Sequence, residues 1–278
     1  MAVSSRFLAY AAAFEIFFFD QYGVLHDGRR PYRGAVETLR ALKGRGARIA
    51  IVSNSGRSGL HNARRLEGLG FPAGLWDHFI TSGDVAKSHL ASAASAVAVS
   101  GSTRCLTIAS SDEHDLADAV GLVSVRDGAE ADLVIVGGSQ GDRLSLDDYR
   151  RLIAPAARRG APCVCTNPDK VMLTPTGMAF GAGAIAQLYE SLGGAVTWIG
   201  KPYPAIYQFA AARIGAPAAA SILCVGDSVE HDIVGARRFG AAAALLRTGV
   251  LAGLSEPDLA AELAKHGVVP DLTAAGFE

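Results

Sequence analysis

The sequence lacks a strong charge of either sign. Lys and Arg total 26 and Asp and Glu total 27 among 278 residues, so the formal net charge is -1. Because nucleic-acid-binding surfaces usually carry an excess of basic residues, we expect no nucleic-acid partner. Charged residues make up only 19% of the chain and hydrophobic residues 50%, which argues against intrinsic disorder and provides for a substantial core. The length fits one large domain or two modest ones.

The sequence also lacks an uninterrupted hydrophobic run that is long enough to span a membrane. The stretch 7–19 is apolar enough to suggest a signal peptide, but it contains Glu15, follows a single Arg and shows no clear cleavage pattern. We interpret it as a short helix that begins at about Ser5 and runs into a strand. We therefore predict a soluble protein with no membrane partner.

Cysteine is scarce, and none of the four cysteines shows the spacing of a zinc site. Cys163 and Cys165 alternate along one expected strand, while Cys105 and Cys224 lie in two other apolar segments. Buried, reduced thiols are the simplest interpretation of this pattern. Such thiols suit a reducing compartment, and we predict a cytoplasmic location.

The most informative stretch begins with four apolar residues, 16–19, that end abruptly at Asp20. A short apolar run is typical of a strand that is buried on both faces. Asp20 would then lie at the carboxyl end of this strand, where open α/β sheets bind ligands. Gly23 lets the backbone turn tightly and approach a ligand. Asp20 is therefore a candidate nucleophile or metal ligand, although an Asp that merely caps a strand fits this stretch equally well.

Apolar runs of strand length alternate with segments of helical spacing along most of the chain. We expect strands at residues 16–19, 47–52, 79–80, 105–108, 133–136, 163–166, 196–199, 221–225 and 242–246. We expect helices at residues 34–45, 60–69, 84–95, 112–119, 147–159, 181–192 and 203–214, and a short helix and tail from Ser255. This alternation predicts an α/β fold with a Rossmann-like, doubly wound parallel sheet. We interpret residues 1–83 and 196–278 as the core domain and residues 84–195 as an inserted, smaller α/β domain.

Polar groups follow three further expected strands. Ser53 and Asn54 end the strand at 47–52, and Lys201 follows the strand at 196–199. Asp227 comes directly after the strand at 221–225, with Asp232 five residues later. These carboxylates are oxygen ligands of the kind that Mg²⁺ prefers. Taken singly, a lone Lys is usually a solvated charge, and an Asp-rich turn often caps a helix.

The order of these groups along the chain is far more specific than any one of them. This order resembles that of the haloacid dehalogenase (HAD) superfamily, with the insertion between the second and third motifs, as in the branch with a C2-type cap. Six motifs together are similar to those of NagD-like, 4-nitrophenylphosphatase-like phosphatases. They are Asp-x-x-Gly-Val-Leu at 20–25, Ser-Asn at 53–54, Thr-Ser-Gly-Asp at 81–84, Thr-Asn-Pro-Asp at 166–169, Gly-Lys-Pro-Tyr-Pro at 200–204 and Gly-Asp-Ser-x-x-x-Asp at 226–232.

The resemblance implies a Mg²⁺-dependent phosphatase that hydrolyses small, sugar-phosphate-like monoesters through an aspartyl phosphate on Asp20. The family's metal ligands correspond to Asp20, the main-chain carbonyl of Tyr22 and Asp227. Asp232 would orient a metal-bound water or Lys201, and Lys201 would neutralise the charge on the nucleophile and the phosphate.

Phosphate and substrate contacts follow from the same resemblance. The Ser53 hydroxyl and the backbone N–H of Asn54 would bind phosphate oxygens. Asn167 and Asp169 in the inserted domain would face the substrate, although an ordinary Asn-Pro-Asp turn explains these residues about as well. A small phosphorylated metabolite is the expected partner, and a homo-oligomer is compatible with the sequence.

One position departs from the family pattern. NagD-like phosphatases have a second Asp two residues after the nucleophile, which protonates the leaving group and then activates water; here the residue is Tyr22. A phenol, with an ordinary pKa of about 10, is a poor base near neutral pH. We therefore expect slow turnover or a substitute base, for which His26 and Asp27 are candidates, although His26 also fits a simple loop residue.

Two alternatives follow from Tyr22. Asp-x-Tyr-Gly is also the pattern of the metal-independent haloacid dehalogenases, which makes a C–halogen hydrolase the first alternative. Asp227 and Asp232 disfavour it, because two carboxylates beside Asp20 would repel one another without a cation. The second alternative is a catalytically weak protein that binds phosphate ligands.

Overall fold

A computed structural model describes residues 6–92, 97, 99–111, 115–174 and 177–277. The chain forms two compact units. The first unit consists of Met1–Ser53, Gly59–Ile80 and Lys201–Glu278, and the second of Asn54–Ser58 and Thr81–Gly200. The predicted insertion, 84–195, therefore lies within the second unit, but that unit also contains the five residues that follow the strand ending at Ser53 and extends to Gly200.

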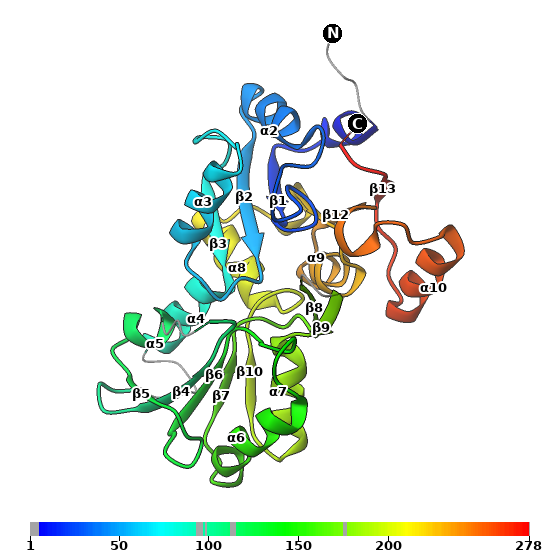
Figure 1. Cartoon of the computed structure of the whole chain (residues 1–278). Coiled ribbons are helices and arrows are strands. Elements are labelled where there is room, and N and C mark those ends of the chain that lie inside the picture. The colour runs from blue at the N-terminus through cyan, green and yellow to red at the C-terminus, as the bar shows by residue number, and fades with distance from the viewer. Residues whose placement is uncertain (1–5, 93–96, 98, 112–114, 175–176, 278) are drawn as a thin grey trace. The chain divides into compact units, whose positions relative to one another are not determined.

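The first unit is built on a six-stranded sheet with the order β13-β12-β11-β1-β2-β3 (Figure 1). Its strands are β1 (Ile16–Phe19), β2 (Arg48–Ser53), β3 (His78–Thr81), β11 (Ile222–Gly226), β12 (Ala242–Leu246) and β13 (Leu272–Ala274). The pairings from β13 through β2 are all parallel. The predicted Rossmann-like parallel core is confirmed, and β13 extends it by a strand of three residues that we did not predict.

Alternate side chains of β1 determine how helices cover this sheet. Phe17 and Phe19 belong to one apolar cluster, together with buried residues of α1 (Arg6–Ala11), α2 (Ala35–Gly44) and α3 (Gly59–Gly68). Phe18 points to the opposite face and stacks on Phe239 of α9 (Val234–Phe239), which stacks in turn on Tyr207 of α8 (Pro204–Arg213). A strand that is apolar on both faces therefore lies between two helical layers, as its continuous apolar run predicts.

The second unit contains a five-stranded parallel sheet with the order β10-β7-β6-β4-β5. Its strands are β4 (Arg104–Ile108), β5 (Val123–Val125), β6 (Leu133–Val136), β7 (Cys163–Cys165) and β10 (Val196–Trp198). Two adjacent helices, α6 (Leu146–Arg158) and α7 (Ala182–Ser191), pack on one face of the sheet (Figure 1). We assigned the strand at 196–199 to the core, and that assignment is wrong, because β10 pairs with β7.

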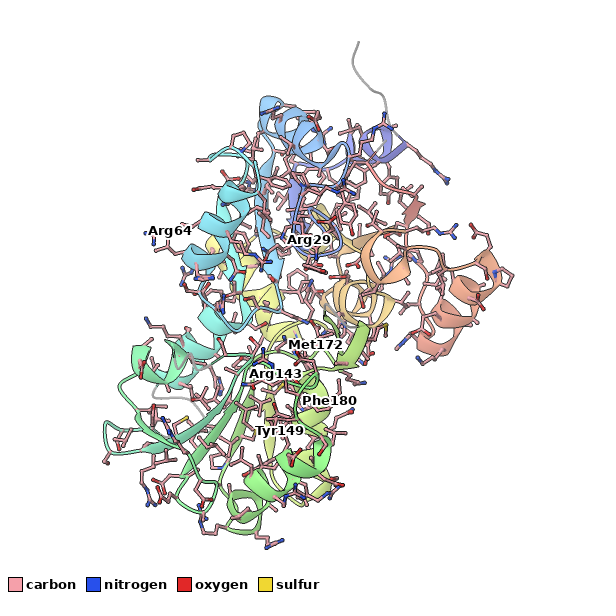
Figure 2. All side chains as sticks on the ribbon, in the orientation of Figure 1. Arg29, Arg64, Arg143, Tyr149, Met172 and Phe180 are labelled. Atoms are coloured by element: carbon pink, nitrogen blue, oxygen red, sulfur yellow. The ribbon has the colours of Figure 1, made fainter. Side chains whose placement is uncertain are left out.

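Sequence analysis also missed the strand β5 of this sheet and an antiparallel hairpin of β8 (Val171–Thr174) and β9 (Gly177–Phe180). Phe180 at its end packs edge to face on Tyr149 of α6, with ring centroids 5.9 Å apart (Figure 2). The hydroxyl of Tyr149 also accepts the backbone N–H of Gln140 at 3.0 Å. A single hairpin is marginally stable in isolation, so this aromatic contact helps to hold it on the second unit.

The remaining helices are close to their predicted positions. The helix predicted at 84–95 is α4 (Ser82–Leu90), and the one predicted at 112–119 is α5 (Asp115–Ala119). Both predictions also include residues that lie outside the described ranges, within 93–96 and 112–114 respectively. The C-terminal helix is α10 (Glu256–His266). All four cysteines are buried and unpaired, as predicted. None of the helices in the described ranges combines the length and the hydropathy that crossing a membrane requires.

Candidate active site

Asp20 and Asp227 follow two neighbouring parallel strands. The register places Phe19 beside Val225, and the backbone N–H of Asp20 donates to the carbonyl of Val225 at 2.8 Å. The residues that follow both strands therefore emerge at the same edge of the sheet. Ser53, at the end of β2 next to β1, is buried at this edge as well. The parallel pairing thus gathers side chains that are distant in the sequence.

The side chain of Lys201 forms ion pairs with two of the predicted carboxylates. Its ammonium donates to Asp20 Oδ1 at 2.5 Å and to Asp232 Oδ1 at 2.7 Å. The Lys201 side chain is only 5% exposed. Burial by itself would lower the pKa of this ammonium, but Asp20 and Asp232 more than reverse the effect and raise the pKa. Lys201 is therefore a fixed positive charge at the site, in contrast to the solvated surface lysine that a single motif allows.

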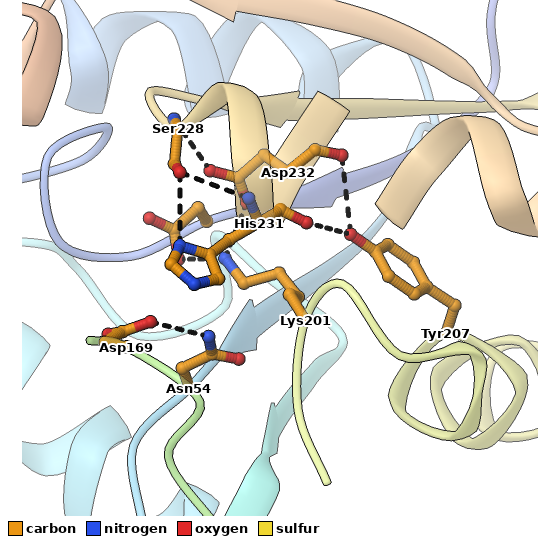
Figure 3. Close-up of polar contacts among 8 residues, drawn as sticks. Asn54, Asp169, Lys201, Tyr207, Ser228, His231 and Asp232 are labelled. Atoms are coloured by element: carbon orange, nitrogen blue, oxygen red, sulfur yellow. Dashed lines mark hydrogen bonds and ion pairs between the residues drawn. The ribbon is translucent and has the colours of Figure 1, made fainter. Parts of the chain in front are cut away.

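Both oxygens of the Asp232 carboxylate have protein partners. Oδ1 accepts from Lys201, and Oδ2 accepts the backbone N–H of Ser228 at 3.0 Å. Asp232 lies in a short π-helical turn, Val229–Ile233, whose His231 carbonyl accepts the hydroxyl of Tyr207 at 3.3 Å (Figure 3). This arrangement favours the orienting role that we considered for Asp232 over direct metal ligation.

The carboxylates of Asp20, Asp227 and Asp232 form a close cluster, in which one oxygen from each lies within 4.8 Å of the others. Burial, opposed by Lys201 and reinforced by Asp232, raises the pKa of Asp20 to about 6. Burial, with Asp20 and Asp232 nearby, raises the pKa of Asp227 well above its ordinary value. Lys201 neutralises one of the three charges, and a divalent cation would neutralise the other two. The oxygen donors and this charge fit Mg²⁺.

One hydrogen bond orients the backbone at Tyr22, whose main-chain carbonyl is a predicted metal ligand. The N–H of Gly23 donates to the carbonyl of His26 at 3.0 Å. Because a trans peptide points its N–H and C=O in opposite directions, the Tyr22 carbonyl is turned away from His26. Tyr22 as a whole is 43% exposed, and its ring packs edge to face on the His26 ring, with centroids 5.6 Å apart. The chain thus offers a main-chain oxygen and an exposed phenol where the family pattern has an Asp.

His26 and Asp27 are poor substitutes for the missing acid and base. His26 is fully buried, its Nδ1 accepts the N–H of Gly28 at 2.8 Å, and burial together with Arg65 lowers its pKa to about 4, although Asp27 acts in the opposite sense. The carboxylate of Asp27 accepts two backbone N–H groups, from Arg29 and Arg30, both at 2.9 Å. These contacts support the simpler interpretation, in which both residues shape the loop.

Asn54 and Asp169 lie together in the second unit. The side-chain amide of Asn54 donates to Asp169 Oδ1 at 2.8 Å (Figure 3), and Asp169 N–H donates to the side-chain oxygen of Asn167 at 3.0 Å. Asn54 is 7% exposed. The predicted residues thus form two groups: Asp20, Lys201, Asp227 and Asp232 in the first unit, and Asn54, Asn167 and Asp169 in the second.

The segment Thr248–Val250, which follows β12, is a part of the site that sequence analysis missed. The N–H of Val250 donates to Asp227 Oδ2 at 2.8 Å, and the hydroxyl of Thr248 donates to the carbonyl of Gly23 at 2.5 Å. A Thr-Gly pair, separated from a buried strand by Arg247 alone, resembles the small polar residues at the other strand ends. That signal was available in the sequence.

The sequence is similar to those of known proteins. A profile described as haloacid dehalogenase-like hydrolase matches residues 17–122, and one described as HAD-hydrolase-like matches residues 198–275. The chain is 32% identical over 235 residues to the D-glycerol 3-phosphate phosphatase of Mycobacterium tuberculosis, covering 83% of this chain and 62% of that protein. This chain therefore spans less than two thirds of that relative's length.

Solved structures agree. A glycerol phosphate phosphatase from Mycobacterium tuberculosis in complex with magnesium superposes with a TM-score of 0.68 at 31% identity, covering 86% of this chain and 70% of that one. A p-nitrophenyl phosphatase from Archaeoglobus fulgidus superposes with a TM-score of 0.75 at 25% identity, covering 95% and 97%. The chain belongs to the haloacid dehalogenase-like hydrolases, and within them to the NagD-like, 4-nitrophenylphosphatase-like branch. The resemblance found in the sequence is confirmed.

Proposed function

We propose that this protein is a Mg²⁺-dependent phosphatase that hydrolyses small phosphate monoesters through an aspartyl phosphate on Asp20. The observation that carries the proposal is the position of Lys201, which pairs with both Asp20 and Asp232 next to the carboxylate of Asp227. The positive charge of Lys201 balances one of three carboxylates, of which Asp227 and Asp232 are buried, and a divalent cation would balance the other two. Such a site suits phosphoryl transfer, in which positioning and charge stabilisation provide most of the catalysis.

Asp20 is the proposed nucleophile. An Asp20 oxygen forms a bond to phosphorus, the bond from phosphorus to the ester oxygen breaks, and the departing oxygen takes up a proton. Water then attacks the aspartyl phosphate, which releases inorganic phosphate and regenerates the Asp20 carboxylate. The attack requires an ionised Asp20, and Lys201 at 2.5 Å favours that form.

Mg²⁺ would be held by Asp20, the main-chain carbonyl of Tyr22 and Asp227, and when bound it would draw charge from the phosphoryl oxygens. Asp232 would keep Lys201 aimed at Asp20, because its Oδ1 accepts from the ammonium while its Oδ2 is held by Ser228. The Ser53 hydroxyl and the Asn54 backbone N–H would bind phosphate oxygens. Asp169 would act through Asn54, since its carboxylate accepts the Asn54 amide.

Tyr22 is the proposed general acid, and its exposed phenol can give a proton to the departing oxygen. It is a weak base for the water step, so we expect slow turnover. The dehalogenase alternative is disfavoured by the buried carboxylate cluster, which calls for a cation. The binding-protein alternative has only Tyr22 in its favour.

We further propose a small, sugar-phosphate-like monoester as the substrate and the cytoplasm as the location. The relative named as a D-glycerol 3-phosphate phosphatase supports a small phosphorylated metabolite, and four buried, unpaired thiols suit a reducing compartment. A homo-oligomer remains compatible with this proposal.

The decisive experiment measures phosphate release from a panel of phosphate monoesters with Mg²⁺, with excess chelator, and with the Asp20→Asn variant. We expect release only from the wild-type protein with Mg²⁺. Phosphate release that is insensitive to both chelator and Asp20→Asn would refute the mechanism. Halide release from 2-haloacids without metal would establish the dehalogenase instead, and ligand binding without turnover would establish the binding protein.

A further inference from the structure

The segment Thr248–Val250 makes three hydrogen bonds to groups around the carboxylate cluster. The N–H of Val250 donates to Asp227 Oδ2 at 2.8 Å, and the hydroxyl of Thr248 donates to the carbonyl of Gly23 at 2.5 Å. Between them, the N–H of Gly249 donates to the hydroxyl of Tyr32 at 3.3 Å. One short segment therefore fixes both the carboxylate of Asp227 and the turn that carries the Tyr22 carbonyl.

Two glycines allow the backbone to come this close to Asp227. Gly249 has a φ of +49°, and a Cβ there would overlap Asp227 Oδ2 and lie 2.5 Å from the Cα of Gly23. Gly23 has a φ of +90°, and a Cβ there would overlap the same carboxylate. Only glycine combines this conformation with such close packing. Asp227 is therefore enclosed by two backbone segments that leave its carboxylate little freedom to rotate.

We propose that Thr248, Gly249 and Val250 are positioning residues for the divalent cation, a role that rests on the proposed Mg²⁺-dependent function. The Val250 N–H donates to Asp227 Oδ2 and thereby fixes the orientation of the carboxylate that would bind the metal. The Thr248 hydroxyl fixes the peptide that follows Gly23, next to the one that carries the Tyr22 carbonyl. Mg²⁺ tolerates little departure from octahedral geometry, so small displacements of its ligands weaken binding.

The expected loss of Mg²⁺ affinity can be judged from other groups that orient metal ligands through hydrogen bonds. Removing such a partner typically costs about 10–100-fold in metal affinity or activity. A segment that merely connected β12 to α10 would contribute to stability and not to metal affinity. Direct measurement of Mg²⁺ binding therefore separates the positioning role from a structural one.

The first test compares two glycine variants, Gly249→Ala and Gly253→Ala. Gly253 also has a positive φ, +79°, but a Cβ there would meet nothing within 4 Å, so its variant measures backbone strain alone. Mg²⁺ affinity is measured by isothermal titration calorimetry on metal-free protein, and stability by thermal unfolding in chelator. We expect Gly249→Ala to bind Mg²⁺ at least about 10-fold more weakly, and Gly253→Ala to bind it as the wild type does.

The second test removes one hydrogen bond without adding an atom to the turn. Thr248→Val lacks the donor to the Gly23 carbonyl, whereas Thr248→Ser retains it. We expect Thr248→Val to weaken Mg²⁺ binding by about 10-fold and Thr248→Ser to restore most of the affinity. This pair also decides the question if Gly249→Ala fails to fold.

The outcomes distinguish this inference from the proposed function. Wild-type binding of Mg²⁺ together with unchanged binding by Gly249→Ala and Thr248→Val would overturn the positioning role alone. Equal losses in Gly249→Ala and Gly253→Ala would also overturn it, because strain would then account for the effect. A wild-type protein that binds no Mg²⁺ would overturn the proposed cofactor, and the positioning role with it.

Discussion

The ammonium of Lys201 lies 2.5 Å from Asp20 Oδ1, although 181 positions separate the two residues in the chain. The same ammonium lies 2.7 Å from Asp232 Oδ1. Both contacts are nearly shielded from water, and burial strengthens the electrostatic coupling within the site. The predictions below follow from this coupling and from the contacts around it.

Replacing Lys201 by Met should remove most of the activity and also destabilise the fold. The change leaves Asp20 and Asp232 without their shared cation, and breaking a buried pair in this way typically costs about 3–5 kcal/mol. Loss of one charge-stabilising group at a reacting centre typically lowers kcat by about 10²–10³-fold. Both effects are measured by steady-state kinetics and by thermal unfolding.

Lys43→Met is a matched control for this variant, because Lys43 pairs with Asp77 at 2.8 Å in a partly exposed position. Such pairs are worth about 0–1 kcal/mol, so we expect a small loss of stability and wild-type kinetics. Equal effects of the two variants would contradict the assigned role of Lys201.

Asp20→Asn should abolish turnover and change how the stability of the metal-free protein depends on pH. Burial raises the pKa of Asp20 from 3.8 to about 6, with Lys201 opposing and Asp232 reinforcing the shift. The folded state therefore binds more protons between these pH values, so stability falls as pH rises through this window. The resulting loss in the free energy of unfolding, on the order of 1–3 kcal/mol, persists above about pH 6.

The measurement is urea unfolding of wild type and Asp20→Asn, in chelator, at pH 4 and pH 7. We expect the variant to gain stability relative to wild type at the higher pH, and Mg²⁺ to restore wild-type stability there. Stability curves that run parallel across the two pH values would show that Asp20 does not titrate in this way.

Tyr22→Asp should raise turnover, because a carboxylate can both protonate the leaving group and activate water. General acid–base help is typically worth about 10²–10⁴-fold, which sets the upper range of the gain. Tyr22→Phe serves as the comparison variant, because it removes only the phenol hydroxyl. We expect it to lower kcat if the phenol donates a proton to the leaving group. A fall in kcat for Tyr22→Asp together with a fall for Tyr22→Phe would mean that the phenol has a role that a carboxylate cannot perform.

Asp169→Ala should weaken substrate binding through Asn54. Its carboxylate accepts the Asn54 amide at 2.8 Å, and the net loss of such a hydrogen bond is about 0.5–1.5 kcal/mol, or roughly 2–10-fold in KM. Asp132→Ala serves as the control, because Asp132 pairs with Arg104 in an exposed position of the same unit. An unchanged KM for Asp169→Ala would remove Asp169 from the site.

Much of the fold could be predicted because it is encoded locally. Continuous apolar runs such as 16–19 indicate strands buried on both faces, and helical spacing between them indicates a parallel sheet. The errors fall where the local signal is weakest. The missed strands, β5, β13 and the two hairpin strands, are only three or four residues long. The partner of β10 depends on which sheet edge is nearby, which no local pattern specifies.

The order of Asp20, Lys201 and Asp227 along the chain indicated the family, because residue types and spacing are properties of the sequence. Only the tertiary structure decided that Asp232 uses both oxygens within the protein, that His26 is buried and that Thr248–Val250 encloses Asp227. The physical reason is that hydrogen bonds and burial depend on distances in space. Parallel strand register sets those distances between segments that the sequence keeps far apart.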